Sequence, residues 1–302
     1  MGQADFEAYY QTAFGVRWPA LRTALLAHGA RLDFKHGLTS PYRLDAASVA
    51  AACALRLPAV GQMLDACAAP GGKSLVLASR LGTDRPLLAN ELSSERRRRL
   101  HDVLDQHLAA ERRSLVTVSG FDAAAAGGRT SEHGRFGAIL LDAPCSSERH
   151  VLADDKALGQ WSAARVRFLA QRQWSLLSSA FLLLVVGGSL VYSTCALSTA
   201  ENDEVVGRLM KKQSGKVAVD LPPDNLAAAL AEAGLSPDGC RPVETGTDNL
   251  AAEIGSDQPA VAGLDDWLGT IQAETTTYGR LYLPDTARGA GPLYIARLVK
   301  LA

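Results

Sequence analysis

Apolar and charged positions change their spacing near residue 59. Beyond it, short apolar runs typical of buried strands alternate with longer segments whose apolar positions recur at helical spacing. Strands that alternate with helices in this way predict a mostly parallel, doubly wound α/β sheet, with the last strand inserted at its edge. The apolar runs predict strands at residues 60–65, 86–91, 115–118, 136–141, 189–193, 216–219 and 292–299. The segments between them predict helices at residues 72–81, 93–108, 161–186 and 199–212.

Capping residues mark the ends of two of these helices. Ser93 is a suitable N-cap for the second helix, and Gly187 with Gly188 would end the long third helix. Upstream, residues 1–40 have a helical pattern that gives way to a loop. We therefore expect a short N-terminal helical extension at residues 1–40, followed by the main domain at residues 41–302.

Composition excludes several classes of protein. No apolar run approaches the roughly 18 residues that a membrane-spanning helix needs, so we expect no membrane span. The first residues have neither the basic start of a signal peptide nor the arginine content of a transit peptide, so no targeting segment is visible. Five cysteines without a Cys-x-x-Cys pair argue against a zinc ribbon or a disulfide scaffold. We expect reduced thiols and no metal.

Charge is distributed unevenly along the chain. Residues 220–274 contain eleven acidic residues and one basic residue, a net charge of −10. The whole chain has a net charge of −1, so the remainder carries +9 and suits a polyanionic partner. The acidic segment should face away from nucleic acid, either as a solvated insertion or as a surface for a protein partner.

Polar residues follow the predicted strands at the ends where ligands bind in open parallel sheets. A glycine-rich turn comes after the first strand and could hold a nucleotide-like cofactor, because its glycines let the backbone approach a ligand closely. It lacks Gly-x-Gly-x-x-Gly, and it is out of frame for a phosphate loop because Cys67 stands where that loop needs glycine. The turn consists of Cys67, Ala68, Ala69, Pro70, Gly71, Gly72 and Lys73.

Side chains outside the turn, and Lys73 within it, are further candidates for contacts with the cofactor. Glu91 follows the second strand and would bind a ribose diol, or it is an acid favoured by a helix N-terminus. Asp122 follows the third strand and would accept a hydrogen bond from an adenine amine, or it forms a turn. Lys73 would steady the ligand, or it is a surface lysine. Arg96 is also assigned to cofactor binding.

Two cysteines define the expected chemistry. Cys145 follows the fourth strand in Asp142-Ala143-Pro144-Cys145, and Cys195 follows the fifth in Ser193-Thr194-Cys195. A free cysteine is usually a small buried hydrophobic residue, which is the interpretation for the thiols of Cys53, Cys67 and Cys240. Two thiols at strand ends beside a cofactor turn instead indicate covalent catalysis on an electrophilic ring.

At these residues the chain resembles the Nop/Sun-domain RNA cytosine-5 methyltransferases. Residues 67–73, 142–145 and 192–195, followed by Ala200-Glu201-Asn202, match three motifs of that family in order and spacing. The resemblance covers roughly residue 41 to the end. It implies a Rossmann-like class I methyltransferase sheet, S-adenosylmethionine as cofactor and an exposed cytosine in RNA as substrate.

The resemblance also implies roles for the site residues. Cys195 would add to C6 of the cytosine, and Cys145 would help to remove the C5 proton or release the adduct. Asp142 would bind the N3/N4 edge of the base and contribute to the cofactor site. Glu91 stands where family members usually have aspartate, and Ala123 where they often have glycine, so the adenine end is expected to differ. Candidate phosphate contacts are Arg96–Arg99, Arg112, Arg113, Arg165 and Arg167.

Within the family the chain is most similar to the mitochondrial ribosomal RNA member. The similarity lies in Ser146 to His150, in the N-terminal Phe14-Gly15 … Trp18-Pro19 … Arg22, and in the ending around Gly291-Pro292. It implies small-subunit ribosomal RNA as substrate, a helical-repeat partner of the mitochondrial transcription-terminator family, a place in ribosome assembly and the mitochondrial matrix as location.

Several alternatives stay open. One is the same chemistry on another RNA, by a bacterial-type ribosomal enzyme or a transfer RNA enzyme, with a cytoplasmic location. A second is a non-catalytic assembly factor, against which the two thiols argue. A third is a DNA cytosine methyltransferase, which uses the Pro-Cys thiol as nucleophile and lacks a second thiol at the Thr-Cys position.

Overall fold

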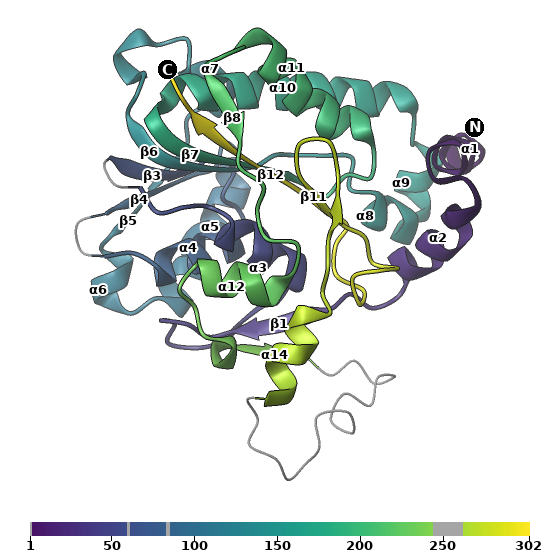
Figure 1. Cartoon of the computed structure of the whole chain (residues 1–302), viewed down its shortest axis with the longest axis horizontal. Coiled ribbons are helices and arrows are strands. Elements are labelled where there is room, and N and C mark those ends of the chain that lie inside the picture. Colours follow the sequence, from purple (N-terminus) through teal and green to yellow (C-terminus); the bar gives the residue numbers. More distant parts are fainter. Residues whose placement is uncertain (1, 59–60, 83–84, 244–261) are drawn as a thin grey trace.

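The computed structural model describes every residue except 1, 59–60, 83–84 and 244–261 (Figure 1). Its centre is a nine-stranded sheet in the order β10-β11-β12-β7-β6-β3-β4-β5, with β8 paired to β12. Strands β3 to β7 run parallel and β12 pairs antiparallel to β7, which confirms the predicted fold class and the late strand. The strands are β3 (Gln62–Asp65), β4 (Leu87–Asn90), β5 (Val116–Ser119), β6 (Phe136–Asp142), β7 (Leu184–Thr194), β8 (Val217–Val219), β10 (Glu274–Thr275), β11 (Arg280–Tyr282) and β12 (Leu293–Lys300).

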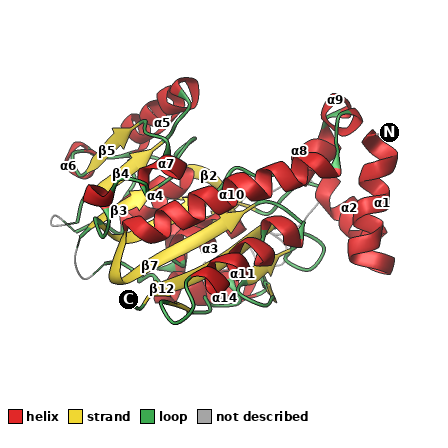
Figure 2. Ribbon diagram, turned by 90° about the horizontal axis from the view of Figure 1, so that it is seen from above, coloured by secondary structure: helices red, strands yellow, loops and turns green. Residues whose placement is uncertain are grey.

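Helices cover both faces of this sheet (Figure 2). Successive side chains of a strand point to opposite faces, so Met63 packs into one core and Leu64 into the other. The first face carries α3 (Ala46–Cys53), α4 (Gly72–Ser79), α5 (Ser94–His107), α12 (Leu226–Glu232) and α14 (Ala262–Gly269). The second face carries α7 (Ala123–Ala126), α10 (Ala163–Leu183) and α11 (Asp203–Lys212). Helix α6 (Ala110–Arg113) and the 3-10 helices η2 (Thr130–Glu132) and η4 (Pro237–Gly239) lie in connections.

A third, aromatic core joins the N-terminal helices to the loop after β6. Phe6, Tyr10, Trp18 and Trp161 pack together with ring centroids 4.7–6.0 Å apart. Leu197, two residues beyond Cys195, belongs to the same cluster. Helix α10 leads from the sheet toward this part of the molecule (Figure 2). The elements are α1 (Gly2–Phe14), η1 (Gly15–Arg17), α2 (Trp18–Leu26), α8 (Glu148–Ala153) and α9 (Asp155–Gly159).

A small sheet follows the N-terminal helices where the sequence predicted only a loop. Its order is β2-β1-β9, formed by Tyr42–Asp45, Arg31–Phe34 and Cys240–Pro242, all antiparallel. The β1–β2 hairpin crosses residue 40, and the predicted domain division there stays a prediction.

The end of the long helix was predicted wrongly. Helix α10 ends at Leu183, and β7 begins at Leu184 rather than after a glycine terminator. The glycine pair lies inside the strand: a Cβ on Gly188 would lie 2.9 Å from the Gly137 carbonyl oxygen of β6. Close backbone approach therefore explains this glycine, and the β6–β7 register shifts nearby. The next predicted helix divides into η3 (Thr199–Glu201) and α11.

Part of the acidic segment packs against the main domain. Leu226 and Leu230 of α12 are buried, and Asp220 and Glu232 each pair with buried Arg297 at 2.9 Å. Residues 244–261 of the acidic segment, like residue 60 of the first predicted strand, lie outside the described residues. Among the described helices, none is long and apolar enough to span a membrane.

Candidate functional site

Polar residues at the carboxyl ends of β3, β6 and β7 line one cavity of about 660 Å³. It lies at the switch point of the sheet, where β3 and β6 are neighbours and Asp65 and Asp142 end the two strands. Asp142 accepts hydrogen bonds from Lys73 Nζ and Ser193 Oγ, each at 2.8 Å. The cavity is also lined by Cys67, Ala68, Ala69, Pro70, Gly72 and Cys195.

The two predicted sulfur atoms are brought together from loops fifty residues apart. Cys195 Sγ lines the cavity and lies 2.7 Å from Cys145 Sγ. Ser147 Oγ contacts both sulfurs, at 3.3 Å and 3.5 Å. The hydrogen bond with Cys195 and burial raise the pKa of Cys145 well above its usual value, so Cys145 is held as a thiol. Both cysteines are half-buried, and Cys195 lines the cavity with the protonated Cys145 thiol in contact with its sulfur.

Lys73, the last residue of the cofactor turn, extends its ammonium group to Asp142 at the end of β6. Burial opposes its charge, but Asp142 outweighs this and, with smaller contributions from Cys195 and Asp65, raises the pKa of Lys73. Its ammonium also donates to Ser48 Oγ at 3.3 Å. The site therefore keeps a charged lysine beside the position of the expected nucleophile.

The cofactor turn is held by the ends of its neighbouring strands. Ala68 N donates to the Asn90 carbonyl at 2.8 Å, and Arg96 donates to the Ala69 carbonyl at 2.7 Å. Gly71 has φ +121°, which favours glycine. Gly72 lines the cavity, and it also packs closely on β2: a Cβ there would lie 2.3 Å from Leu44 Cδ2. Its approach to a ligand stays a prediction.

Two buried carboxylate oxygens near this turn, Asp65 Oδ1 and Glu91 Oε2, have no hydrogen-bond partner among the described residues. Glu91 Oε1 accepts from Ser93 N at 2.9 Å, while Oε2 forms an ion-pair contact with Arg96 at 3.3 Å. Burial raises the pKa of Asp65 to about 7. These two buried oxygens lie near the backbone of the cofactor turn. They are suited to a ligand that carries hydroxyl or amine donors, as a nucleoside does.

Asp122 has protein partners. It accepts from Ala124 N at 3.0 Å as the N-cap of α7 and pairs with Arg172 Nη2 at 2.8 Å. This is the turn-forming alternative stated for the residue, and Asp122 is not among the residues that line the cavity. Its role toward an adenine amine stays a prediction.

Some candidate phosphate contacts are occupied by protein. Arg97 donates to the Glu91 carbonyl at 2.8 Å, Arg112 to the Ala78 carbonyl at 2.7 Å, and Arg113 pairs with Asp105 at 2.6 Å. Three other arginines line the cavity, and two of them also have protein partners: Arg43 pairs with Asp33 at 3.0 Å, and Arg149 donates to the Gly289 carbonyl at 3.1 Å. Arg31, Arg43 and Arg149 are shared with an adjoining groove of about 560 Å³ beside α2. Their scatter over residues 31 to 149 explains why sequence reasoning missed them.

Two buried glutamates lie behind the sulfurs and were not predicted as site residues. Glu148 accepts from Leu197 N at 3.0 Å, and from Ser146 Oγ. Glu201 accepts from Ser146 N at 3.0 Å and from Gln173 Nε2 at 2.7 Å. Their sequence signals are their closeness to the two cysteines and the family similarities at Ser146–His150 and Ala200-Glu201-Asn202. Among the described residues, no group of three or more His, Cys, Asp or Glu side chains could hold a metal ion.

Comparison with known proteins gives this arrangement a family. The model of the family described as 16S rRNA methyltransferase RsmB/F matches residues 52–233, more than half of the chain. The chain belongs to the RsmB/F methyltransferase family. That stretch contains the cofactor turn and both cysteines, which confirms the resemblance drawn from the motifs.

Curated relatives of the family align over the same part. The chain is 41% identical over 179 residues to ribosomal RNA small subunit methyltransferase F of Aeromonas hydrophila, covering 59% of this chain and 36% of the relative. It is 43% identical over 148 residues to the protein of that name in Shewanella sediminis, covering 49% and 30%. The chain thus spans about a third of the length of these relatives.

Solved structures agree on the fold. The crystal structure of NSun6 from Pyrococcus horikoshii with SFG has a TM-score of 0.57 at 21% identity, covering 89% of this chain and 54% of that one. A methyltransferase homologue from the same organism has a TM-score of 0.62 at 20% identity, covering 97% and 93%. Both support the Rossmann-like methyltransferase fold.

Proposed function

We propose that this chain is an S-adenosylmethionine-dependent RNA cytosine-C5 methyltransferase that acts on small-subunit ribosomal RNA. The observation that carries the proposal is the pair of sulfurs at 2.7 Å, one of them in a cavity that also holds the cofactor turn and Asp142. The names of the aligned relatives support ribosomal RNA as the substrate class.

The cofactor site would be formed by the turn at residues 67–73 with Asp65 and Glu91. Their unpartnered oxygens are suited to accept hydrogen bonds from the bound nucleoside. When bound, S-adenosylmethionine supplies an activated methyl group. The protein's part is to hold that group and the target base in one orientation.

Cys195 is assigned the nucleophilic role because its sulfur faces the cavity. Addition of its thiolate to C6 of cytosine makes C5 electron-rich enough to accept a methyl group. Asp142, fixed between Lys73 and Ser193, would bind the N3/N4 edge of the base. Cys145, whose raised pKa keeps it protonated, is suited to donate its proton to the Cys195 sulfur as the C6–S bond breaks, with the C5 proton passing to solvent.

The RNA strand is proposed to enter along the arginine-lined groove beside α2. Arg31, Arg43 and Arg149 connect this groove to the cavity that contains Cys195. A cytosine must leave its helix to enter a cavity of this kind, so we expect an exposed or extruded base. Phosphates on either side of it would then contact the guanidinium groups.

The mitochondrial assignments are proposals that rest on the N- and C-terminal similarities. They comprise mitochondrial small-subunit ribosomal RNA, a role in ribosome assembly, a partner of the transcription-terminator family and the mitochondrial matrix. The organisms of the aligned relatives favour the bacterial-type substrate as the alternative. Mapping of methylated cytosines in both RNAs, with and without the protein, separates the two.

Methyl transfer to small-subunit ribosomal RNA tests the activity directly. We expect Cys195→Ser to lose at least about a thousandfold in rate. Cys145→Ala should accumulate a protein–RNA adduct on denaturing gels. The cofactor should bind both variants as it binds the wild type, measured by titration calorimetry. Full activity of Cys195→Ser would refute the nucleophile, whereas cofactor-free ribosomal RNA binding alone would support a non-catalytic assembly factor.

A further inference from the structure

Helix α1 makes two side-chain hydrogen bonds to the loops that bear the reactive sulfurs. Tyr10 Oη donates to Glu148 Oε1 at 2.5 Å, and Tyr9 Oη lies 2.9 Å from Ser198 Oγ. The first bond joins residues 138 positions apart, the second 189. Tyr10 and Glu148 are both fully buried.

Glu148 connects both loops to this helix. One oxygen accepts from Tyr10 and from Ser146 Oγ, next to Cys145; the other accepts from Leu197 N, two residues after Cys195. A single carboxylate is therefore bonded to a group on each side of the sulfur pair. Glu201 adds a second connection, because it binds Ser146 N from the Cys195 side.

The loop at Cys145 needs such support because its backbone is strained. Ser147 lies between Ser146 and Glu148. Its φ of +57° and ψ of +58° fall in the left-handed region that non-glycine residues avoid. A residue persists there only when the surrounding contacts fix it. Its hydroxyl contacts both sulfurs, so this conformation determines what surrounds them.

We propose that Tyr10, on helix α1, is a positioning residue. Through its hydrogen bond to Glu148 it holds Cys145 and Cys195 in fixed positions relative to each other. Buried carboxylates are costly, and no lysine or arginine pairs with Glu148 among the described residues. The N-terminal helices are then part of the reactive site rather than an appendage to it. The effect of Tyr10 on the positions of the two sulfurs can be tested without RNA. Its effect on turnover rests on the function proposed above.

The test measures how readily the two thiols meet. Diamide takes up the two thiol hydrogens as its N=N bond becomes a hydrazine N–N bond, and the sulfurs form a disulfide. We expect Tyr10→Phe to slow formation of the Cys145–Cys195 disulfide about tenfold, since a hydrogen bond to a charged group is lost. Intact mass gives the rate, and peptide mapping assigns the pair.

Tyr282→Phe is the matched control. Tyr282 is also a buried tyrosine, but its hydroxyl has no hydrogen-bond partner in the part of the chain that the structure describes. It should oxidise at the wild-type rate. Tyr9→Phe provides a second variant on the same helix. The Tyr9 hydroxyl bonds Ser198 on the Cys195 side and does not reach Glu148, so a smaller slowing is expected. This variant replaces Tyr10→Phe if that protein does not fold.

The second measurement is a comparison of kcat and KM for methyl transfer. We expect Tyr10→Phe to lower kcat about tenfold while KM for the cofactor stays unchanged. Wild-type rates of disulfide formation in the α1 variants would overturn the positioning role. If the wild type transfers no methyl group but the disulfide rates differ as expected, the proposed function fails and the positioning role stands.

Discussion

Glu201 allows a quantitative test of the buried carboxylates behind the sulfurs. Burial, followed by repulsion from Glu148, raises the pKa of Glu201 to about 7. Hydrogen bonds from Ser146 and Gln173 oppose the rise, and Glu201 Oε1 has no partner. The substitution Glu201→Gln keeps an oxygen for these donors and removes the charge.

The sign of the effect follows from the raised pKa. The folded protein binds this proton more tightly than the unfolded chain, whose glutamate has a pKa near 4.5. The resulting stability is fully present below pH 4.5 and is lost as the pH rises through about 7. At about 1.4 kcal/mol per pH unit, the whole loss is about 3 kcal/mol.

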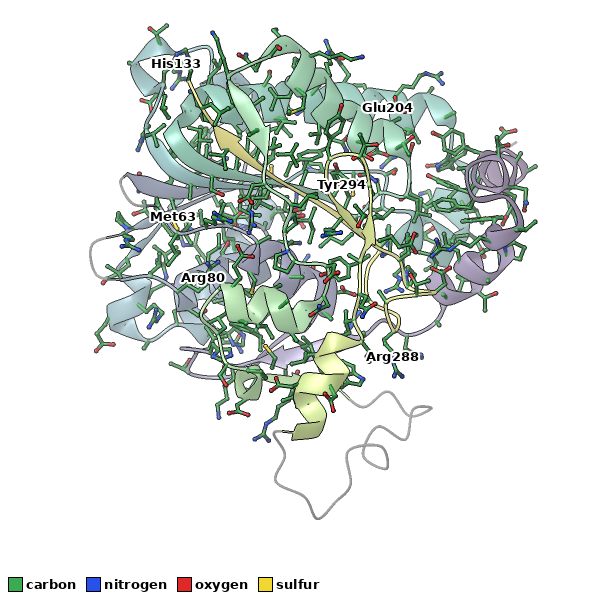
Figure 3. The ribbon with its side chains drawn as sticks, viewed as in Figure 1. Met63, Arg80, His133, Glu204, Arg288 and Tyr294 are labelled. Carbon is green, nitrogen blue, oxygen red and sulfur yellow. The ribbon has the colours of Figure 1, made fainter. Side chains whose placement is uncertain are left out.

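Urea unfolding at a series of pH values between 5 and 8 measures this loss. We expect the free energy of unfolding of Glu201→Gln, minus that of the wild type, to rise by about 2 to 3 kcal/mol across this range. Asp65, whose pKa also rises to about 7, contributes equally to both proteins and cancels. Glu204→Gln, at an exposed position near the start of α11, is the control and should parallel the wild type (Figure 3). Parallel curves for Glu201→Gln and wild type would refute the reasoning.

Two further substitutions test the cavity. Gly72→Ala places a Cβ against Leu44 and should lower the free energy of unfolding by about 1–3 kcal/mol, whereas Gly159→Ala, in open space, is its control in the same urea assay. Arg31→Ala should weaken RNA binding and reduce the slope of log affinity against log salt by about one, measured by fluorescence anisotropy. A wild-type slope would exclude Arg31 from the RNA path.

Much of the sheet could be predicted because buried parallel strands are short, continuous apolar runs. The convergence of Asp142, Lys73, Cys145 and Cys195 could also be predicted, since the carboxyl ends of neighbouring parallel strands share one edge. The switch point between β3 and β6 places these ends side by side. The strand order of the sheet thus brings residues from more than a hundred positions of sequence together in one site.

The details that the sequence does not reveal depend on contacts between distant residues. Gly72 belongs to the predicted cofactor turn, yet a Cβ there would also meet Leu44 and Tyr42 of a hairpin with four-residue strands. Gly188 resembles a helix terminator, but its neighbour is the backbone of β6. A glycine indicates that another group lies close to its Cα, but the surrounding sequence does not say which group. Local pattern therefore cannot distinguish these cases.

The same limit applies to the glutamates, and their position explains why the fold retains them. The chain leaves β6 and β7 just before the two cysteines, so the backbone amides beyond them lose the partners that a sheet supplies. Ser146 N and Leu197 N find acceptors in Glu201 and Glu148. Replacing either acid with an apolar residue would leave a buried amide unsatisfied at the very loop that presents a sulfur. The buried glutamates that lower the free energy of unfolding near neutral pH are therefore also the ones that hold the two cysteine loops in position.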